Sequence, residues 1–111
     1  MASYALTAKG KVRGGIISIQ DHAQQRPLSE LSTQDRSAIE SEVLLIRDTL
    51  GGSAMIEPTH KSLEEVVDNI RAVLDMADHQ QRELDTLERD VVIDAALSLL
   101  LTLQTENERS S

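Results

Sequence analysis

The sequence of 111 residues contains no cysteine, tryptophan or phenylalanine and only one tyrosine. The absence of cysteine excludes a disulfide framework, a thiolate metal site and a cysteine nucleophile. Because aromatic side chains are almost absent, aliphatic side chains must form the core, and these pack well between helices. The composition therefore favours a mainly helical fold with one modest core.

Long apolar runs are missing as well. The longest spans 13 residues, from Val91 to Leu103, and is interrupted by Asp94, Ser98 and Thr102, whereas a bilayer span needs about 20 apolar residues. The first residues lack the charged start and apolar stretch of a secretion signal. We therefore expect a cytoplasmic protein that does not bind membranes.

Basic residues are scarce relative to acidic ones. The chain has 11 lysines and arginines against 19 aspartates and glutamates, and its net charge is −8. This excess of acid makes direct nucleic-acid binding unfavourable. The first 20 residues differ, because they carry Lys9, Lys11 and Arg13 and no acid. A short basic arm thus precedes an acidic body, which would suit a basic partner protein.

The residues of this arm have the pattern of β-structure. Apolar residues alternate with small or polar ones from Tyr4 to Ala8, as in a half-buried strand, and residues 16–19 include three β-branched apolar side chains. Gly10 could supply the turn between two strands. We expect a small N-terminal β element, either a hairpin or single strands.

Helical patterns follow the arm. Ser32 and Asp35 have the spacing of a helix start, and Gly51 with the next glycine marks its end. Between them, four apolar residues recur at spacings of four, three and four, as on one face of a helix: Ile39, Val43, Ile46 and Leu50. A second helix is expected to begin after Thr59 or Ser62, since either residue could cap it.

The length of this second helix is open to two interpretations. The chain could turn back near residues 78–82, or a single helix could run from Ser62 to Asn107. The apolar heptad pattern keeps its register from Leu63 to Val91, and no glycine or proline interrupts it, which favours the single helix. Such a helix would be roughly 69 Å long, too long for a compact monomer of this size.

The apolar C-terminal segment also indicates an oligomer. A helix that is apolar on all sides must be buried on all sides, and the rest of a single chain does not obviously suffice. We therefore expect a mainly α fold: the β element, then two to three helices, with the long C-terminal helix forming a homo-oligomer interface. Residues 1–26 would be the basic arm and linker, and residues 27–111 the helical oligomerisation domain. The expected interface residues are Leu63, Ile70, Leu84, Leu87, Val91, Leu97, Leu100 and Leu101.

Few residue groups in the sequence suggest chemistry. Lys9, Lys11 and Arg13 surround a glycine-rich turn and could hold a nucleotide or another anion. The trio Asp75, His79 and Glu83 has helical spacing, but a solvated helix face explains it better than a metal site does. No Gly-x-Ser-x-Gly motif and no convergent acid–base set is present. We expect neither catalysis nor a cofactor nor a metal.

Three functions fit these features. The first is protein–protein binding by a small acidic oligomer acting as an adaptor, an inhibitor or a regulatory subunit. Small size and strong acidity are typical of antitoxins and of inhibitors from phages or mobile elements. The second is an oligomer that sequesters or senses an anion at the basic turn. The third is a structural or chaperone-like coiled-coil protein.

Overall fold

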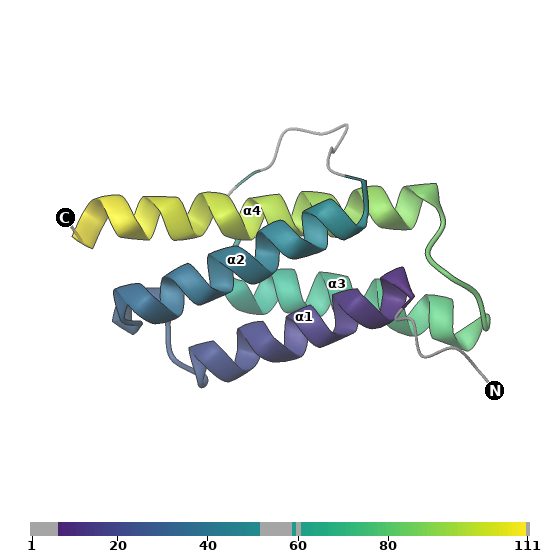
Figure 1. Ribbon diagram of the computed structural model, residues 1–111, viewed down its shortest axis with the longest axis horizontal. Helices are drawn as coiled ribbons and strands as arrows, with labels where there is room; N and C mark the ends of the chain where they lie inside the picture. Colours follow the sequence, from purple (N-terminus) through teal and green to yellow (C-terminus); the bar gives the residue numbers. More distant parts are fainter. Residues whose placement is uncertain (1–6, 52–58, 60, 111) are drawn as a thin grey trace.

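The computed structural model describes residues 7–51, 59 and 61–110, and within these ranges it contains helices and no strand. The α-helices are α1 (Ala8–Ala23), α2 (Thr33–Thr49), α3 (Leu63–His79) and α4 (Thr86–Ser110), and a short 3-10 helix, η1 (Leu28–Glu30), precedes α2 (Figure 1). The expected mainly α class is thus confirmed, whereas the expected N-terminal β element is wrong.

The four α-helices pack as a bundle (Figure 1). Helix α1 packs against α2 and α3, and α4 packs against the same two helices. Both α1 and α4 run antiparallel to these neighbours, so that α2 and α3 run in the same direction. The start of α3 therefore lies at the opposite end of the bundle from the end of α2, as in helix bundles with one crossover connection.

Helix α1 forms where the sequence suggested strands. The side chain of Thr7 caps it by accepting a hydrogen bond from the backbone N–H of Gly10 (3.1 Å). Its buried apolar residues recur at spacings of four, three and four, which is a helical period: Val12, Ile16, Ile19 and Ala23. The β-branched cluster is therefore part of a helix face. Tyr4 and Leu6, the other basis of the strand prediction, lie outside the described residues.

A glycine in α1 lets this helix approach α2 closely. Gly15 is buried, and a Cβ atom at this position would lie 3.0 Å from Cδ1 of Ile46. The neighbouring Gly14 is exposed, and no atom lies within 4 Å of the corresponding Cβ position. The two adjacent glycines thus differ in role, since only Gly15 faces another helix.

The expected starts of the next two helices are confirmed. The hydroxyl of Ser32 accepts a hydrogen bond from the backbone N–H of Asp35 (3.1 Å) at the start of α2. The hydroxyl of Ser62 does the same for Glu65 (3.2 Å) at the start of α3. Helix α2 ends before Gly51, whose φ of 108° suits a glycine.

The single long helix over residues 62–107 is wrong, because the chain turns back between α3 and α4. Asp85 and Glu88 form a reciprocal cap at the start of α4: each backbone N–H donates to the other residue's carboxylate, at 2.8 and 3.1 Å. Arg82 also pairs with the carboxylate of Glu88. The longest dimension of the molecule is accordingly 48 Å.

Helix α4 lies in contact with most of the rest of the molecule. It packs against α2, α3 and η1. Six of its apolar side chains are at most 2% exposed: Val92, Ile93, Ala95, Ala96, Leu99 and Leu103. The connection before α3 also contacts α4, because the hydroxyl of Thr102 donates to the carbonyl oxygen of Lys61 (2.8 Å) and the Lys61 ammonium lies 3.2 Å from the carboxylate of Asp94. One chain thus covers much of the apolar C-terminal segment, which had been expected to need other chains for its burial.

Across residues 7–51, 59 and 61–110, no helix has the length and apolar content needed to cross a membrane.

Candidate functional site

Two of the three residues expected to bind an anion lie opposite carboxylates. The Lys9 ammonium is 2.8 Å from the carboxylate of Asp78, and Arg13 pairs with Asp78 and, at 3.6 Å, with Asp75. Lys11 is exposed, and the structure shows no ion pair for it within the described ranges. The structure thus brings Lys9 and Arg13 together on one side of α1, where they join α1 to α3. Their charges there are compensated, which makes the site less attractive to an anion.

This ion-pair group gives the folded protein a pH-dependent contact. The hydrogen bond from Lys9 to Asp78, together with the positive charges of Lys9 and Arg13, lowers the pKa of Asp78 below its ordinary value of 3.8. The folded state therefore binds the proton of Asp78 less readily than the unfolded state does. The resulting stabilisation is complete above the ordinary pKa and is lost as the pH falls through the lower pKa of the folded protein.

We predict that Asp78→Asn lowers the urea midpoint of unfolding at pH 6 and that this difference from the wild type shrinks below about pH 4. The effect should also be weaker at high salt, because the carboxylate is nearly half exposed, at 46%. Urea titrations of both proteins between pH 6 and pH 2 measure the difference. A difference that stays constant over this range would contradict the assignment.

The eight residues expected at an oligomer interface do not lie on one surface. Ile70 and Leu84 are buried inside the chain, at 1% and 4% exposure, and are not available to a second chain. Four residues are half-buried: Leu63, Leu97, Leu100 and Leu101. Leu87 and Val91 are exposed, at 75% and 45%. Assembly through these exposed positions stays a prediction.

The possible metal ligands do not form a site. Within the part of the chain that the structure describes, no three histidine, aspartate or glutamate side chains lie close enough to hold a metal ion. Asp75 is close to Arg13, and the carboxylate of Glu83 accepts a hydrogen bond from the backbone N–H of Lys9 (3.1 Å). The carboxylates of this trio thus contribute to the contacts of α1 with α3 and with the segment that follows α3.

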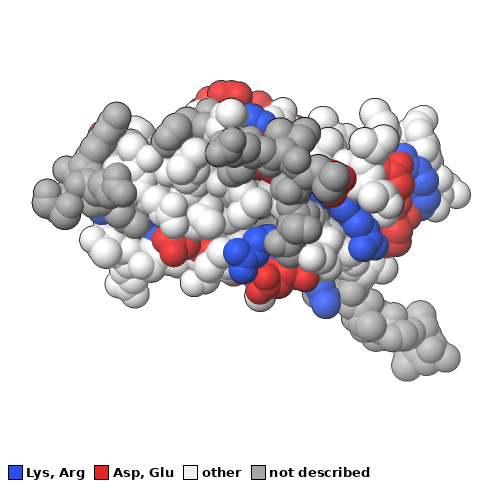
Figure 2. Space-filling model, turned by 90° about the horizontal axis from the view of Figure 1, so that it is seen from above, with Lys and Arg blue, Asp and Glu red and all other residues white. Residues whose placement is uncertain are grey.

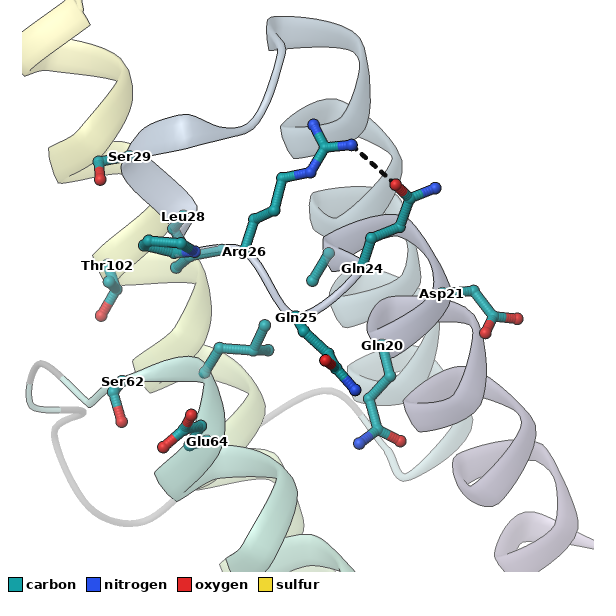
Figure 3. A pocket seen from close by; sticks show the side chains of 13 residues that line it. Gln20, Asp21, Gln24, Gln25, Arg26, Leu28, Ser29, Ser62, Glu64 and Thr102 are labelled. Carbon is teal, nitrogen blue, oxygen red and sulfur yellow. Dashed lines mark hydrogen bonds between the residues drawn. The ribbon is translucent and has the colours of Figure 1, made fainter.

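An open cleft of about 1240 Å³ lies at the end of the bundle where α1 ends and α3 begins (Figure 3). Residues of α1, η1, α3 and α4 and the loop after α1 line it. Ala23 and Leu28 are buried and Leu63 is half-buried, so these three side chains give the cleft an apolar floor. The other lining residues are mainly polar: Gln20, Asp21, Gln24, Gln25, Arg26, Ser29, Ser62, Glu64 and Thr102.

Three glutamines give the cleft its polar wall. The side-chain oxygen of Gln20 accepts a hydrogen bond from Arg71 (3.1 Å), and that of Gln24 accepts one from Arg26 (2.8 Å). Both arginines are thereby engaged at the edge of the cleft. Gln24 and Gln25 have φ values of 50° and 61°, in the left-handed region that non-glycine residues seldom adopt. This local backbone places the Gln25 side chain beside that of Gln20 (Figure 3).

The elements around the cleft carry an excess of exposed acid. Five carboxylates of α1, η1 and the first two turns of α3 are exposed, and none has an ion pair among the described residues: Asp21, Glu30, Glu64, Glu65 and Asp68. The basic residues at or beside the lining are each engaged with another residue: Arg26 hydrogen bonds to Gln24, Arg71 hydrogen bonds to Gln20, and Lys61, next to Ser62, pairs with Asp94. Seen from the side of α4, by contrast, the molecule has acidic and basic groups next to one another with wide uncharged areas between them (Figure 2).

The sequence alone did not reveal this cleft. Residues 21–31 are polar and contain Pro27, which is typical of a linker, and nothing in their pattern indicates that they close onto Ser62 and Glu64. The sequence also did not predict the left-handed backbone conformation of Gln24 and Gln25, because this conformation is usually indicated by glycine or asparagine. Comparisons with known protein families, curated proteins and solved structures find no match to this chain.

Proposed function

We propose that this protein acts without catalysis, by binding a basic segment of another protein in the cleft between α1, η1 and α3. Such binding would make it an adaptor, an inhibitor or a regulatory subunit. The observation that carries the proposal is the group of exposed carboxylates without ion pairs on the elements that form the cleft.

The charge around the cleft supports a basic partner. Asp21 and Glu64 line the cleft itself, and Glu65 and Asp68 follow on α3. Like charges that lie close together on one surface repel one another, and an incoming lysine or arginine relieves this repulsion. A surface with charge of one sign also attracts an oppositely charged partner over distance and speeds the encounter.

The size of the cleft supports a polypeptide partner. Pockets for small molecules usually have volumes of about 300–1,000 Å³ and enclose most of the ligand. This cleft exceeds that range, at about 1240 Å³, and is open to solvent. It can therefore accept several consecutive residues of a chain.

Charge removal tests the proposal. We predict that the triple variant Asp21→Asn, Glu64→Gln, Asp68→Asn loses, by tenfold or more, the capture of partners with lysine- and arginine-rich segments from a cell extract, measured by quantitative mass spectrometry. Capture by the wild type should also fall when the salt concentration rises above about 0.15 M, because exposed charges are screened.

A matched control keeps the same change in net charge but places it elsewhere. The variant Glu40→Gln, Asp48→Asn, Asp90→Asn alters carboxylates of α2 and α4, none of which lines the cleft. It should retain the partners. Equal capture by both triple variants would overturn the proposed function.

A further inference from the structure

We infer that the segment bound in the cleft is extended and that the side-chain amides of Gln20 and Gln25 hydrogen bond to its backbone. This inference rests on the proposed function and adds to it the conformation of the partner. It distinguishes an unstructured basic tail or loop from the basic face of a folded domain or helix.

The first argument is the hydrogen-bonding capacity of the cleft wall. A glutamine side chain carries two donors and one acceptor oxygen. The oxygen of Gln20 is already engaged by Arg71, which leaves its amide nitrogen as a donor on the cleft side (Figure 3). The side chain of Gln25 makes no hydrogen bond to another described residue and offers both a donor and an acceptor. Together they complement the N–H and C=O groups that every extended residue presents.

A helical partner would not use these groups. In a helix the backbone N–H and C=O groups bond to one another, except at its ends. The two glutamines would then face only side chains. An extended chain has free backbone groups and also turns alternate side chains to opposite sides. Its lysines or arginines could thus reach the carboxylates of Asp21 and Glu64.

The backbone of the cleft wall supports the same assignment. Gln25 adopts a φ of 61°, which glycine would adopt without strain. A glutamine at this position places an amide at the cleft, whereas a glycine would leave this part of the wall bare. The apolar floor of Ala23, Leu28 and Leu63 suits the aliphatic stems of lysine and arginine, which pack on apolar surfaces while their charged ends stay in water.

The experiment uses the full chain and three synthetic probes. The first is a capped heptapeptide of alternating lysine and serine, which is unstructured and basic. The second is the same peptide with its backbone nitrogens methylated, which keeps the charge but cannot donate from the backbone. The third is spermine, a polycation without peptide groups. Binding is measured by isothermal titration calorimetry.

The expected pattern separates charge from backbone recognition. The peptide should bind the wild type, and backbone methylation should weaken binding about tenfold, as expected for the loss of one or two hydrogen bonds. The variant Gln20→Ala, Gln25→Ala should weaken peptide binding by a similar factor and leave spermine binding unchanged. Gln34→Ala, which alters an exposed glutamine outside the cleft, should bind all probes like the wild type.

The two proposals can fail separately. If methylation and the two-glutamine variant leave peptide affinity unchanged, while Asp21→Asn, Glu64→Gln, Asp68→Asn weakens it, charge alone binds the partner and the extended-chain inference is wrong. If that charge variant binds the peptide as tightly as the wild type does, the proposed function fails too. No binding of the peptide to the wild type at about 1 mM also overturns the inference, and the capture experiment then decides the proposed function.

Discussion

Leu99→Ala is expected to lower the free energy of unfolding by about 3 kcal/mol. Leu99 lies in α4 and is fully buried, at 0% exposure, so that the substitution removes buried methyl groups and leaves a cavity. Because domains of this size are stable by only about 5–15 kcal/mol, the loss is a large part of the total. Urea denaturation followed by circular dichroism measures it.

Leu87→Ala is the matched control in the same helix. Leu87 is 75% exposed, and we expect a change within about 0.5 kcal/mol. Both proteins should be unfolded at two concentrations that differ tenfold. If the core of α4 is formed within one chain, the midpoints do not depend on concentration. A midpoint that rises with concentration, together with a large loss in Leu87→Ala, would instead indicate assembly through this helix.

Gly15→Val is expected to destabilise the protein by about 2 kcal/mol. A Cβ atom at Gly15 would already lie 3.0 Å from Cδ1 of Ile46, and valine adds two methyl groups at this contact. Helices α1 and α2 would have to separate, or Ile46 would have to leave its packed position. Thermal unfolding measures the effect, which should lower the melting temperature by about 8–16 °C.

The control is Gly14→Val, one residue earlier in the same helix. The Cβ position of Gly14 has no atom within 4 Å, and valine has a slightly better helix propensity than glycine. This variant should be as stable as the wild type or more stable by a few tenths of a kcal/mol. If both variants lose stability equally, the close approach of α1 and α2 at Gly15 is not the cause.

The sequence allowed the starts of α2 and α3 and the end of α2 to be predicted because their signals are local. Ser32 and Ser62 cap helices through hydrogen bonds to residues three positions later, and such spacing is visible in the sequence. The periodic apolar residues between Ile39 and Leu50 are likewise one buried face of one helix. Where capping and periodicity agree, one sequence is sufficient.

Helix α1 was predicted as strands because local preference and periodicity conflict there. Isoleucine favours strands, and Gly14 and Gly15 disfavour a helix interior. The spacing of Val12, Ile16 and Ile19 nevertheless has the period of a helix. Burial of this face against the other helices decides the outcome, and this contact cannot be seen in a local window.

The turn between α3 and α4 was the less favoured of the two interpretations of residues 62–107, although the sequence contains a signal for it. Asp85 and Glu88 are spaced as in a capping box before an apolar run, and in the structure they cap each other's backbone. The heptad pattern nevertheless favoured a continuous helix, because the apolar positions before and after these two residues keep the same register. A capping motif is therefore better evidence for a new helix than continuous register is for a single one.

The cleft could not be predicted because its parts are distant in the sequence. Gln25 follows α1, whereas Ser62 and Glu64 begin α3, and the antiparallel packing of these two helices brings them together. Distance in the sequence also affected the interpretation of the expected anion site. Lys9 and Arg13 formed a basic group in the sequence, but the carboxylates of Asp75 and Asp78, more than 60 residues later, lie opposite them.

The order of the helices also has a consequence for how the protein reaches its native state. Helices α1 and α2 form one hairpin and α3 and α4 another, each closed by fewer than ten residues, so that little loop-closure entropy opposes either of them. Contacts close in sequence form early in helical proteins, and we expect the two hairpins to form before they dock. Because the cleft takes its walls from both hairpins, it is complete only after docking. An unfolding intermediate with both hairpins intact would thus have lost the cleft.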